Sequence, residues 1–207
     1  MSGFELAILW TGWALAGASP GPATLSIAGT AMRAGRRAAL VFSLGILAGS
    51  ASLGIAAAFG MGAIMMTNAW VVELVRYLGA GYLLYLAFRS LRSALQPGSS
   101  AQQKGHDGTA AQLFLRGLLI HLTNPKAILS WGAIFAVTLG PDAALGDVFA
   151  MFAFLFCGSV IVFPGYAMLF STSRVVALYA RARRGFEAVF AAFFGTVALS
   201  ILTAKLT

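Results

Sequence analysis

The chain has 207 residues, of which 59% are hydrophobic and only 10% are charged. Soluble domains carry about 25% charged residues, so the composition excludes a water-soluble globule and predicts an all-α integral membrane protein. The formal net charge of +8 does not indicate nucleic-acid binding, because the basic residues cluster between apolar runs, as cytoplasmic loops do.

Apolar runs of about 20 residues, enough to cross a bilayer, occur six times along the chain. The predicted membrane spans are residues 4–29, 38–64, 69–91, 112–138, 146–171 and 186–204. A polar stretch rich in Gly and Ser lies between the third and fourth spans and predicts a flexible cytoplasmic loop at 96–111. We therefore expect one three-helix repeat at 1–95 and a second at 112–207.

The charges of the loops predict the orientation of the chain. Basic side chains surround the loops after the first, third and fifth spans: Arg33, Arg36, Arg37, Arg89, Arg92, Lys104, Arg116, Arg174, Arg181, Arg183 and Arg184. The loops MTN at 66–68 and GPDAALGD at 140–147 have none. Because positively charged loops stay in the cytoplasm, both termini are expected outside. The opening MSGFE lacks Lys and Arg and carries Glu5, unlike a cleaved signal peptide.

Two spans contain residues that break helices. The first has ASPGPATL at 18–25 and the fourth has HLTNPKAIL at 121–129. Aligning Pro22 with Pro125 gives an offset of about half the chain, and each motif opens a three-span half. Three is an odd number, so the second half enters the membrane in the opposite direction. This arrangement predicts an inverted repeat whose broken helices mark a transport site.

The breaks predict a site made largely of backbone groups. Proline lacks an N–H, so the carbonyls of Ala16, Ala18 and His121 lose their helical donors and could accept a solute ammonium. The helix starts that follow the breaks favour an anion such as a carboxylate. We therefore expect solute binding at these residues: Pro20, Gly21, Pro22, Asn124, Pro125 and Lys126.

Lys126 is the most informative single residue, because a charge at the middle of a span costs roughly 2.5–3.5 kcal/mol on insertion scales. We expect it to receive the solute carboxylate; the alternative is a structural pairing with the freed carbonyls. Glu73 is interpreted either as an interfacial ion pair with Arg76 or as a proton-coupling group, and no other carboxylate is assigned to a span. His121 is a second coupling candidate or a packing histidine.

Other signals point to packing or exclude chemistry. Gly45 and Gly49 form a GxxxG pattern, which favours close helix approach. The single cysteine, Cys157, excludes a disulfide framework, and the spans lack clustered metal ligands, so no metal and no cofactor are expected. An intramembrane enzyme using Ser19 and His121 is the least favoured alternative, because no acid orients the histidine. We expect no enzyme activity and no catalytic residues.

Several stretches resemble the LysE/RhtB exporters of amino acids and related metabolites. They are SPGPATLSIAGTAMRAGRRAAL, SLGILAGSASLG, VRYLGAGYLLYLAFRSLRS and FLRGLLIHLTNPKAILSWGAIF. The resemblance implies a six-span bacterial inner-membrane exporter, a homodimer, working by secondary transport with possible proton coupling. The chain departs from the family at Ala23, where an asparagine is usual, and at His121, where a small polar residue is frequent. Ala23 therefore joins the expected solute-binding residues.

The sequence thus predicts export of small amino-acid-like solutes by alternating access, with the two broken helices forming the site. Neutral amino acids or their derivatives are favoured over dibasic ones. Another small zwitterionic or anionic metabolite is the alternative substrate, and a non-transporting membrane scaffold is a further, weaker reading.

Overall fold

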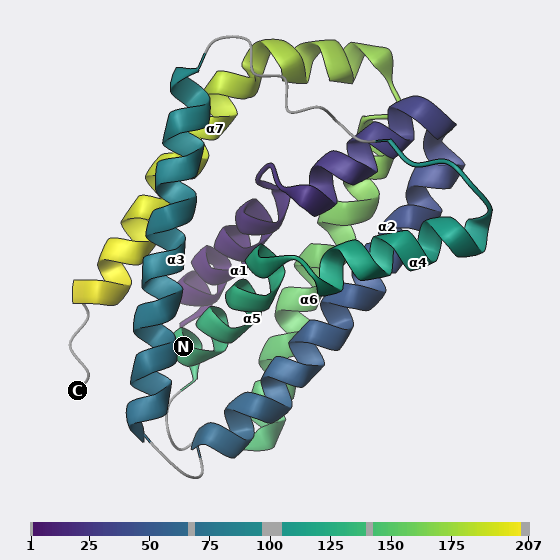
Figure 1. The fold of residues 1–207 in the computed structure, drawn as a ribbon. Helices are drawn as coiled ribbons and strands as arrows, with labels where there is room; N and C mark the ends of the chain where they lie inside the picture. Colours follow the sequence, from purple (N-terminus) through teal and green to yellow (C-terminus); the bar gives the residue numbers. More distant parts are fainter. Residues whose placement is uncertain (1, 66–68, 97–104, 140–142, 204–207) are drawn as a thin grey trace.

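Every regular element in the computed structural model is a helix across the described residues, 2–65, 69–96, 105–139 and 143–203 (Figure 1). The helices are α1 (Gly3–Ala18), α2 (Pro22–Met65), α3 (Ala69–Leu95), α4 (Ala110–Leu122), α5 (Pro125–Thr138), α6 (Leu145–Leu169) and α7 (Ser173–Thr203). The all-α prediction is confirmed.

Three segments among the described residues are long and apolar enough to cross a membrane: Pro22–Gly60, Leu145–Leu169 and Arg181–Thr203. The predicted first span is divided between α1 and the start of α2, and the predicted fourth span between α4 and α5. The count of six spans therefore stays a prediction.

Both predicted breaks are helix ends. α1 stops at Ala18 and α2 begins at Pro22, while α4 stops at Leu122 and α5 begins at Pro125. Ser19 and Asn124, each directly before a proline, have extended backbones with ψ of 144° and 109°. A proline disfavours the α conformation of the residue before it, so each helix must end there. In Figure 1 both breaks lie near the centre of the molecule.

α2 bends sharply at Gly35, whose φ of 82° and ψ of 178° lie outside the helical region. A positive φ of this size favours glycine, which has no Cβ to clash. The bend divides α2 into a first arm, residues 22–34, and a second arm, residues 36–65. The chain thus turns back at the basic loop predicted after the first span.

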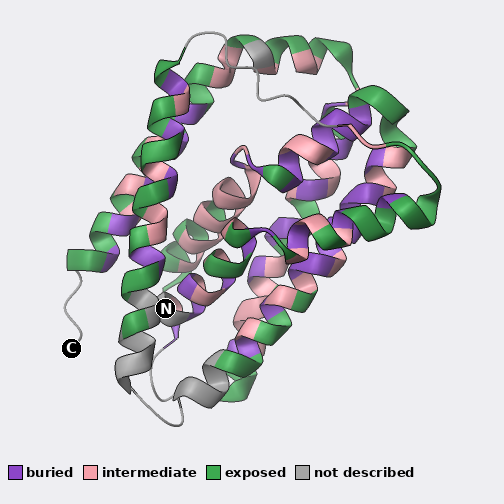
Figure 2. Ribbon diagram, viewed as in Figure 1, coloured by how far each residue is buried: buried purple, intermediate pink, exposed green. Residues whose placement is uncertain are grey.

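The helices pack in two groups. The second arm of α2 packs on α4 and α6, and α3 packs along α7 (Figure 1). A Cβ at Gly45 would lie 2.0 Å from the Phe114 carbonyl oxygen, and one at Gly49 would lie 2.9 Å from the His121 Cβ. The prediction that these glycines allow close helix approach is confirmed. Figure 2 shows buried residues on the faces between helices and exposed residues on the outer faces.

The predicted flexible loop at 96–111 is only partly within the described residues, and its flexibility stays a prediction. Residues 97–104 lie outside the described residues, and α4 already begins at Ala110. Between them, Asp107 pairs with Arg33 at 2.7 Å and the His106 N–H donates to the Thr30 hydroxyl at 3.2 Å. The His106 ring also stacks on Phe42, with ring centroids 5.2 Å apart. Specific contacts therefore hold this part of the loop against α2.

Candidate functional site

The first break satisfies its own freed carbonyls. The Ser19 hydroxyl donates to the Ala16 carbonyl at 2.9 Å, and the Tyr166 hydroxyl of α6 donates to the Ala18 carbonyl. Thr24 closes the start of α2, because its hydroxyl accepts from the Gly21 N–H at 3.0 Å. The hydroxyls of Ser19, beside Pro20, and of Tyr166, from α6, thus replace the donors that the prolines lack.

The second break is closed in the same manner. The Asn124 N–H donates to the His121 carbonyl at 3.0 Å, and the Asn124 side-chain oxygen accepts from the Lys126 N–H at 3.1 Å. Asn124 is therefore the N-cap of α5, with Pro125 in the first turn. The expectation that the freed carbonyls remain open to a solute ammonium is wrong in this conformation, because protein donors occupy them.

Lys126 joins the two breaks. Its ammonium donates to the Ser19 carbonyl at 3.0 Å and makes a second hydrogen bond to the Ser19 hydroxyl. The Lys126 side chain also lies against Gly21, where a Cβ would come within 3.6 Å of it. A single cation therefore bridges two segments that are 107 residues apart.

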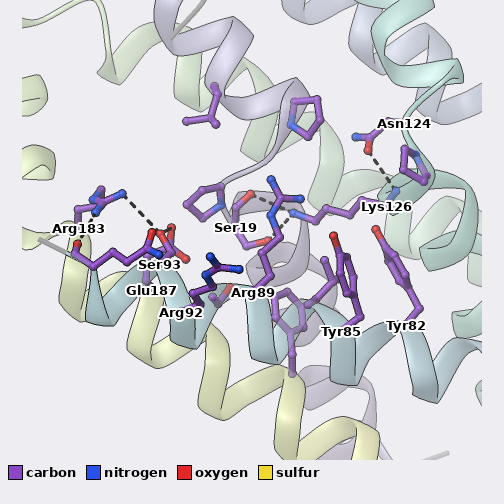
Figure 3. Close-up of a pocket in the computed structure, with 18 of the residues that line it drawn as sticks. Ser19, Tyr82, Tyr85, Arg89, Arg92, Ser93, Asn124, Lys126, Arg183 and Glu187 are labelled. Atoms are coloured by element: carbon purple, nitrogen blue, oxygen red, sulfur yellow. Dashed lines mark hydrogen bonds between the residues drawn. The ribbon is translucent and has the colours of Figure 1, made fainter. Parts of the chain in front are cut away.

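These residues line a cavity of about 570 Å³. Its wall at the breaks includes Ser19, Pro20, Pro22, Asn124, Pro125 and Lys126, and the opposite wall comes from α3 and α7. In Figure 3 the Lys126 side chain points toward Ser19, and Arg89 extends toward the same point from α3. Five of the seven predicted solute-binding residues thus share one cavity.

The remaining two, Gly21 and Ala23, lie at the other side of the first break. They line a smaller hollow of about 50 Å³, together with Trp13, Ser50 and Ser159. Ala23 is buried. Ser19, Asn124 and Lys126 line both spaces, so the two breaks form the partition between them.

Two indole–serine pairs close the small hollow. The Trp13 Nε1 donates to the Ser159 hydroxyl at 3.2 Å, and the Trp131 Nε1 donates to the Ser50 hydroxyl at 3.3 Å. The two indole rings contact each other, with centroids 4.3 Å apart. They make an aromatic barrier on the side of the breaks away from the large cavity.

The far wall of the cavity holds residues that the sequence reading missed. They are mainly tyrosines, arginines and one acid: Tyr82, Tyr85, Arg89, Arg92, Ser93, Tyr179, Arg183 and Glu187. The basic residues among them were assigned to loop topology alone. The sequence signal for these residues was their position at the ends of apolar runs. Their place in the cavity wall depends on the packing of α3 against α7.

Glu187 corrects the expectation that Glu73 is the one carboxylate in a span, and it already falls within the predicted span 186–204. It is buried on α7, within the apolar segment Arg181–Thr203. Its carboxylate accepts from the Ser93 hydroxyl at 3.1 Å, and the Arg183 guanidinium reaches the same hydroxyl at 3.5 Å. The Arg184 Nε donates to the Ala94 carbonyl at 2.9 Å. These contacts hold α3 and α7 together at the end of the cavity farthest from Lys126 (Figure 3).

The two coupling candidates are placed differently. His121 is buried and its ring packs on Phe163, with centroids 5.4 Å apart, but it lines neither space. Its Nδ1 has no hydrogen-bond partner in the described chain, and the Ser19 hydroxyl donates to a carbonyl instead. A Ser19–His121 pair is thus not formed. Glu73 lies on α3, but its side chain is outside the described residues.

Comparisons with known proteins identify the family of this chain. Residues 14–205 match the family model of the LysE type translocators. The threonine efflux protein of Salmonella typhi is 27% identical over 189 residues, covering 90% of this chain and 92% of the relative. The threonine efflux protein of Escherichia coli K12 is 26% identical with the same coverage. An uncharacterized membrane protein of that strain, YahN, is 28% identical over 184 residues, covering 89% and 82%.

No solved structure matches the chain. The relatives are named as efflux proteins and the family as translocators, in keeping with the expectation of a transporter and not an enzyme. Because the family model covers nearly the whole chain, from the first break through α7, this protein belongs to the LysE type translocator family, a family of membrane amino-acid efflux transporters.

Proposed function

We propose that the protein exports a small amino-acid-like solute across the bacterial inner membrane by alternating access, and that the 570 Å³ cavity is its cytoplasm-facing solute site. The observation that carries this proposal is the Lys126 ammonium, which reaches Ser19 of the other break at the cavity wall. A cation placed there can receive the carboxylate that all amino acids share. The threonine efflux relatives support this substrate class.

The direction of opening follows from the charges. The cavity extends from Lys126 to Arg92, Gln96 and Arg183, which lie beside the loops predicted to be cytoplasmic. On the other side of the breaks, Trp13 lines the small hollow, and Trp131 packs against Trp13 and donates to Ser50 of its wall. The conformation is therefore interpreted as open inward and closed outward, with both chain termini outside.

We also propose that the two halves form an inverted repeat of three spans each. Two GS pairs, Gly49–Ser50 on α2 and Gly158–Ser159 on α6, support this. Helix α4 packs against Gly49 through His121. Helix α1 packs against Gly158 through Trp13, and a Cβ on Gly158 would lie 3.2 Å from the Trp13 indole. The serines accept from Trp131 and Trp13 respectively. Each half thus packs its broken helices on the GS pair of the other half, as rocking between repeats requires.

Counterflow in proteoliposomes tests this function. The purified full chain is expected to exchange labelled amino acids, and Lys126→Met is expected to lower the rate at least about tenfold through loss of one charge-assisted hydrogen bond. Arg36→Gln, an exposed residue that lines neither space, is the control. Wild-type rates in a folded Lys126→Met protein would rule out the proposed role of this lysine. Homodimerisation and proton coupling stay predictions.

A further inference from the structure

We infer that the cavity selects amino-acid-sized solutes with a net negative charge, with Lys126 and Arg89 each receiving one anionic group. This inference rests on the proposed export function and specifies its substrate class. It differs from a simple transfer of the relatives' name, because threonine carries no net charge.

The charges that line the cavity are unbalanced. Four cationic side chains, Arg89, Arg92, Lys126 and Arg183, face a single carboxylate, Glu187. Arg92 lies in the last turn of α3 and Arg183 at the start of the apolar segment of α7, where the cytoplasmic location alone accounts for arginine. Lys126 lies beside the breaks, and Arg89, an exposed residue one turn before Arg92, extends toward the same point (Figure 3).

Neither Lys126 nor Arg89 has a carboxylate within hydrogen-bond distance among the described residues. The partners of the Lys126 ammonium at the first break are the neutral oxygens of Ser19. Within the described part of the chain, Arg89 makes no hydrogen bond, and the salt bridge found joins Arg33 and Asp107 outside the cavity. The charges of Arg89 and Glu187 both act on Lys126, but only Arg89 extends with Lys126 toward Ser19 in Figure 3. Two like charges that share one cavity raise each other's energy.

Lys126 and Arg89 together can bind two anionic groups of one solute. The carboxylate common to all amino acids neutralises one of the two cations, and a side-chain carboxylate would neutralise the other. Guanidinium binds carboxylate with two parallel hydrogen bonds. Glu187 is not placed to do this, because its carboxylate is held by Ser93 at the opposite end of the cavity. The tyrosines Tyr82 and Tyr85 line the cavity at the end where Lys126 lies (Figure 3).

The test is a competition in proteoliposomes that contain the full chain and have no membrane potential. Unlabelled aspartate, threonine and lysine compete for counterflow of labelled aspartate. Aspartate is expected to compete about tenfold better than threonine, the difference for one charged hydrogen bond, and lysine is expected to be weakest. Arg89→Gln is expected to reduce the aspartate preference about tenfold with little change for threonine. Arg36→Gln is the matched control, and Arg89→Lys should keep most of the preference.

The outcomes separate the two proposals. Equal or better competition by threonine in the wild-type protein overturns the inference and leaves the export function intact. A folded Arg89→Gln protein with an unchanged aspartate preference also overturns it. Absence of counterflow by the wild-type protein with every amino acid tested counts against the proposed function itself. The wild-type competition decides the question even if the arginine variants fail to fold.

Discussion

The Lys126 ammonium lies 3.0 Å from the carbonyl oxygen of Ser19, and this contact joins the two helix breaks of the molecule. Both residues come from helix ends that proline imposes. Under the proposed function Ser19 holds the ammonium that would receive the solute carboxylate, so binding would exchange one partner of Lys126 for another.

A double-mutant cycle measures the second contact of this pair, from the Lys126 ammonium to the Ser19 hydroxyl. Ser19→Ala removes one hydrogen bond to a charged group, and Lys126→Met removes the donor, so the two changes should not be additive. We expect a coupling energy of about 1–3 kcal/mol in the free energy of unfolding, measured by denaturation in detergent. Additive effects of the two substitutions would contradict the bridging role of Lys126.

Tyr166→Phe is expected to destabilise the first break. The Tyr166 hydroxyl is the donor to the Ala18 carbonyl, and its loss leaves a backbone acceptor unpaired at membrane depth. The expected cost is about 1–3 kcal/mol of unfolding free energy. Tyr77→Phe is the control, since Tyr77 is 48% exposed on α3; an equal effect of both substitutions would argue against a specific role of Tyr166.

Gly45→Ala is expected to weaken the packing of α2 on α4. A Cβ there would lie 2.0 Å from the Phe114 carbonyl oxygen, a backbone atom that moves only with its helix. Overpacking of this kind costs about 1–3 kcal/mol. Gly60→Ala on the same helix meets nothing within 4 Å and should be neutral or stabilising by up to about 1 kcal/mol, because alanine favours helix. Melting temperatures in detergent distinguish the two, and equal shifts would refute the packing argument.

Trp13→Ala is expected to open the barrier on the outward side. Its indole contacts Trp131 and donates to Ser159, so truncation removes both a ring contact and a hydrogen bond. In a Cys157→Ser background, a Ser130→Cys reporter in the small hollow should then react faster with an impermeant thiol reagent added outside. Trp10→Ala serves as a control on the same helix. An unchanged reaction rate would mean that another element closes this side.

Asp107 should titrate abnormally. The hydrogen bond from Arg33, and then the charge of Arg33, lower the pKa of this carboxyl from its usual value of 3.8. A lowered folded-state pKa means that the contact contributes at pH above the usual value and is lost as the pH falls through the lowered one. Carboxyl ¹³C NMR should show the lowered pKa, and Arg33→Gln should return it toward 3.8. A pKa that does not respond to Arg33→Gln would contradict this cause.

Much of the site was accessible from the sequence because proline acts locally. Pro22 and Pro125 start helices wherever the chain folds, since a missing N–H and a fixed φ are properties of the residue itself. The same holds for Asn124 as a helix cap, and a lysine in an apolar run marks a functional position by its solvation cost alone. The predicted residues Pro20, Pro22, Asn124, Pro125 and Lys126 accordingly meet at one cavity.

The partners of these residues were not accessible in this way. Tyr166 reaches the Ala18 carbonyl from 148 residues along the chain, and Arg89 and Glu187 become cavity residues only because α3 pairs with α7. In sequence they look like ordinary residues at the ends of apolar runs.

The sequence by itself therefore determined the membrane class, the family, the positions of both breaks and the central lysine, because composition, proline geometry and charge burial are local properties. Only the tertiary structure decided which donors close the freed carbonyls and which charges surround the cavity. Those depend on helix packing, where a rotation of one helix by a single residue, about 100°, turns a different side chain toward the site.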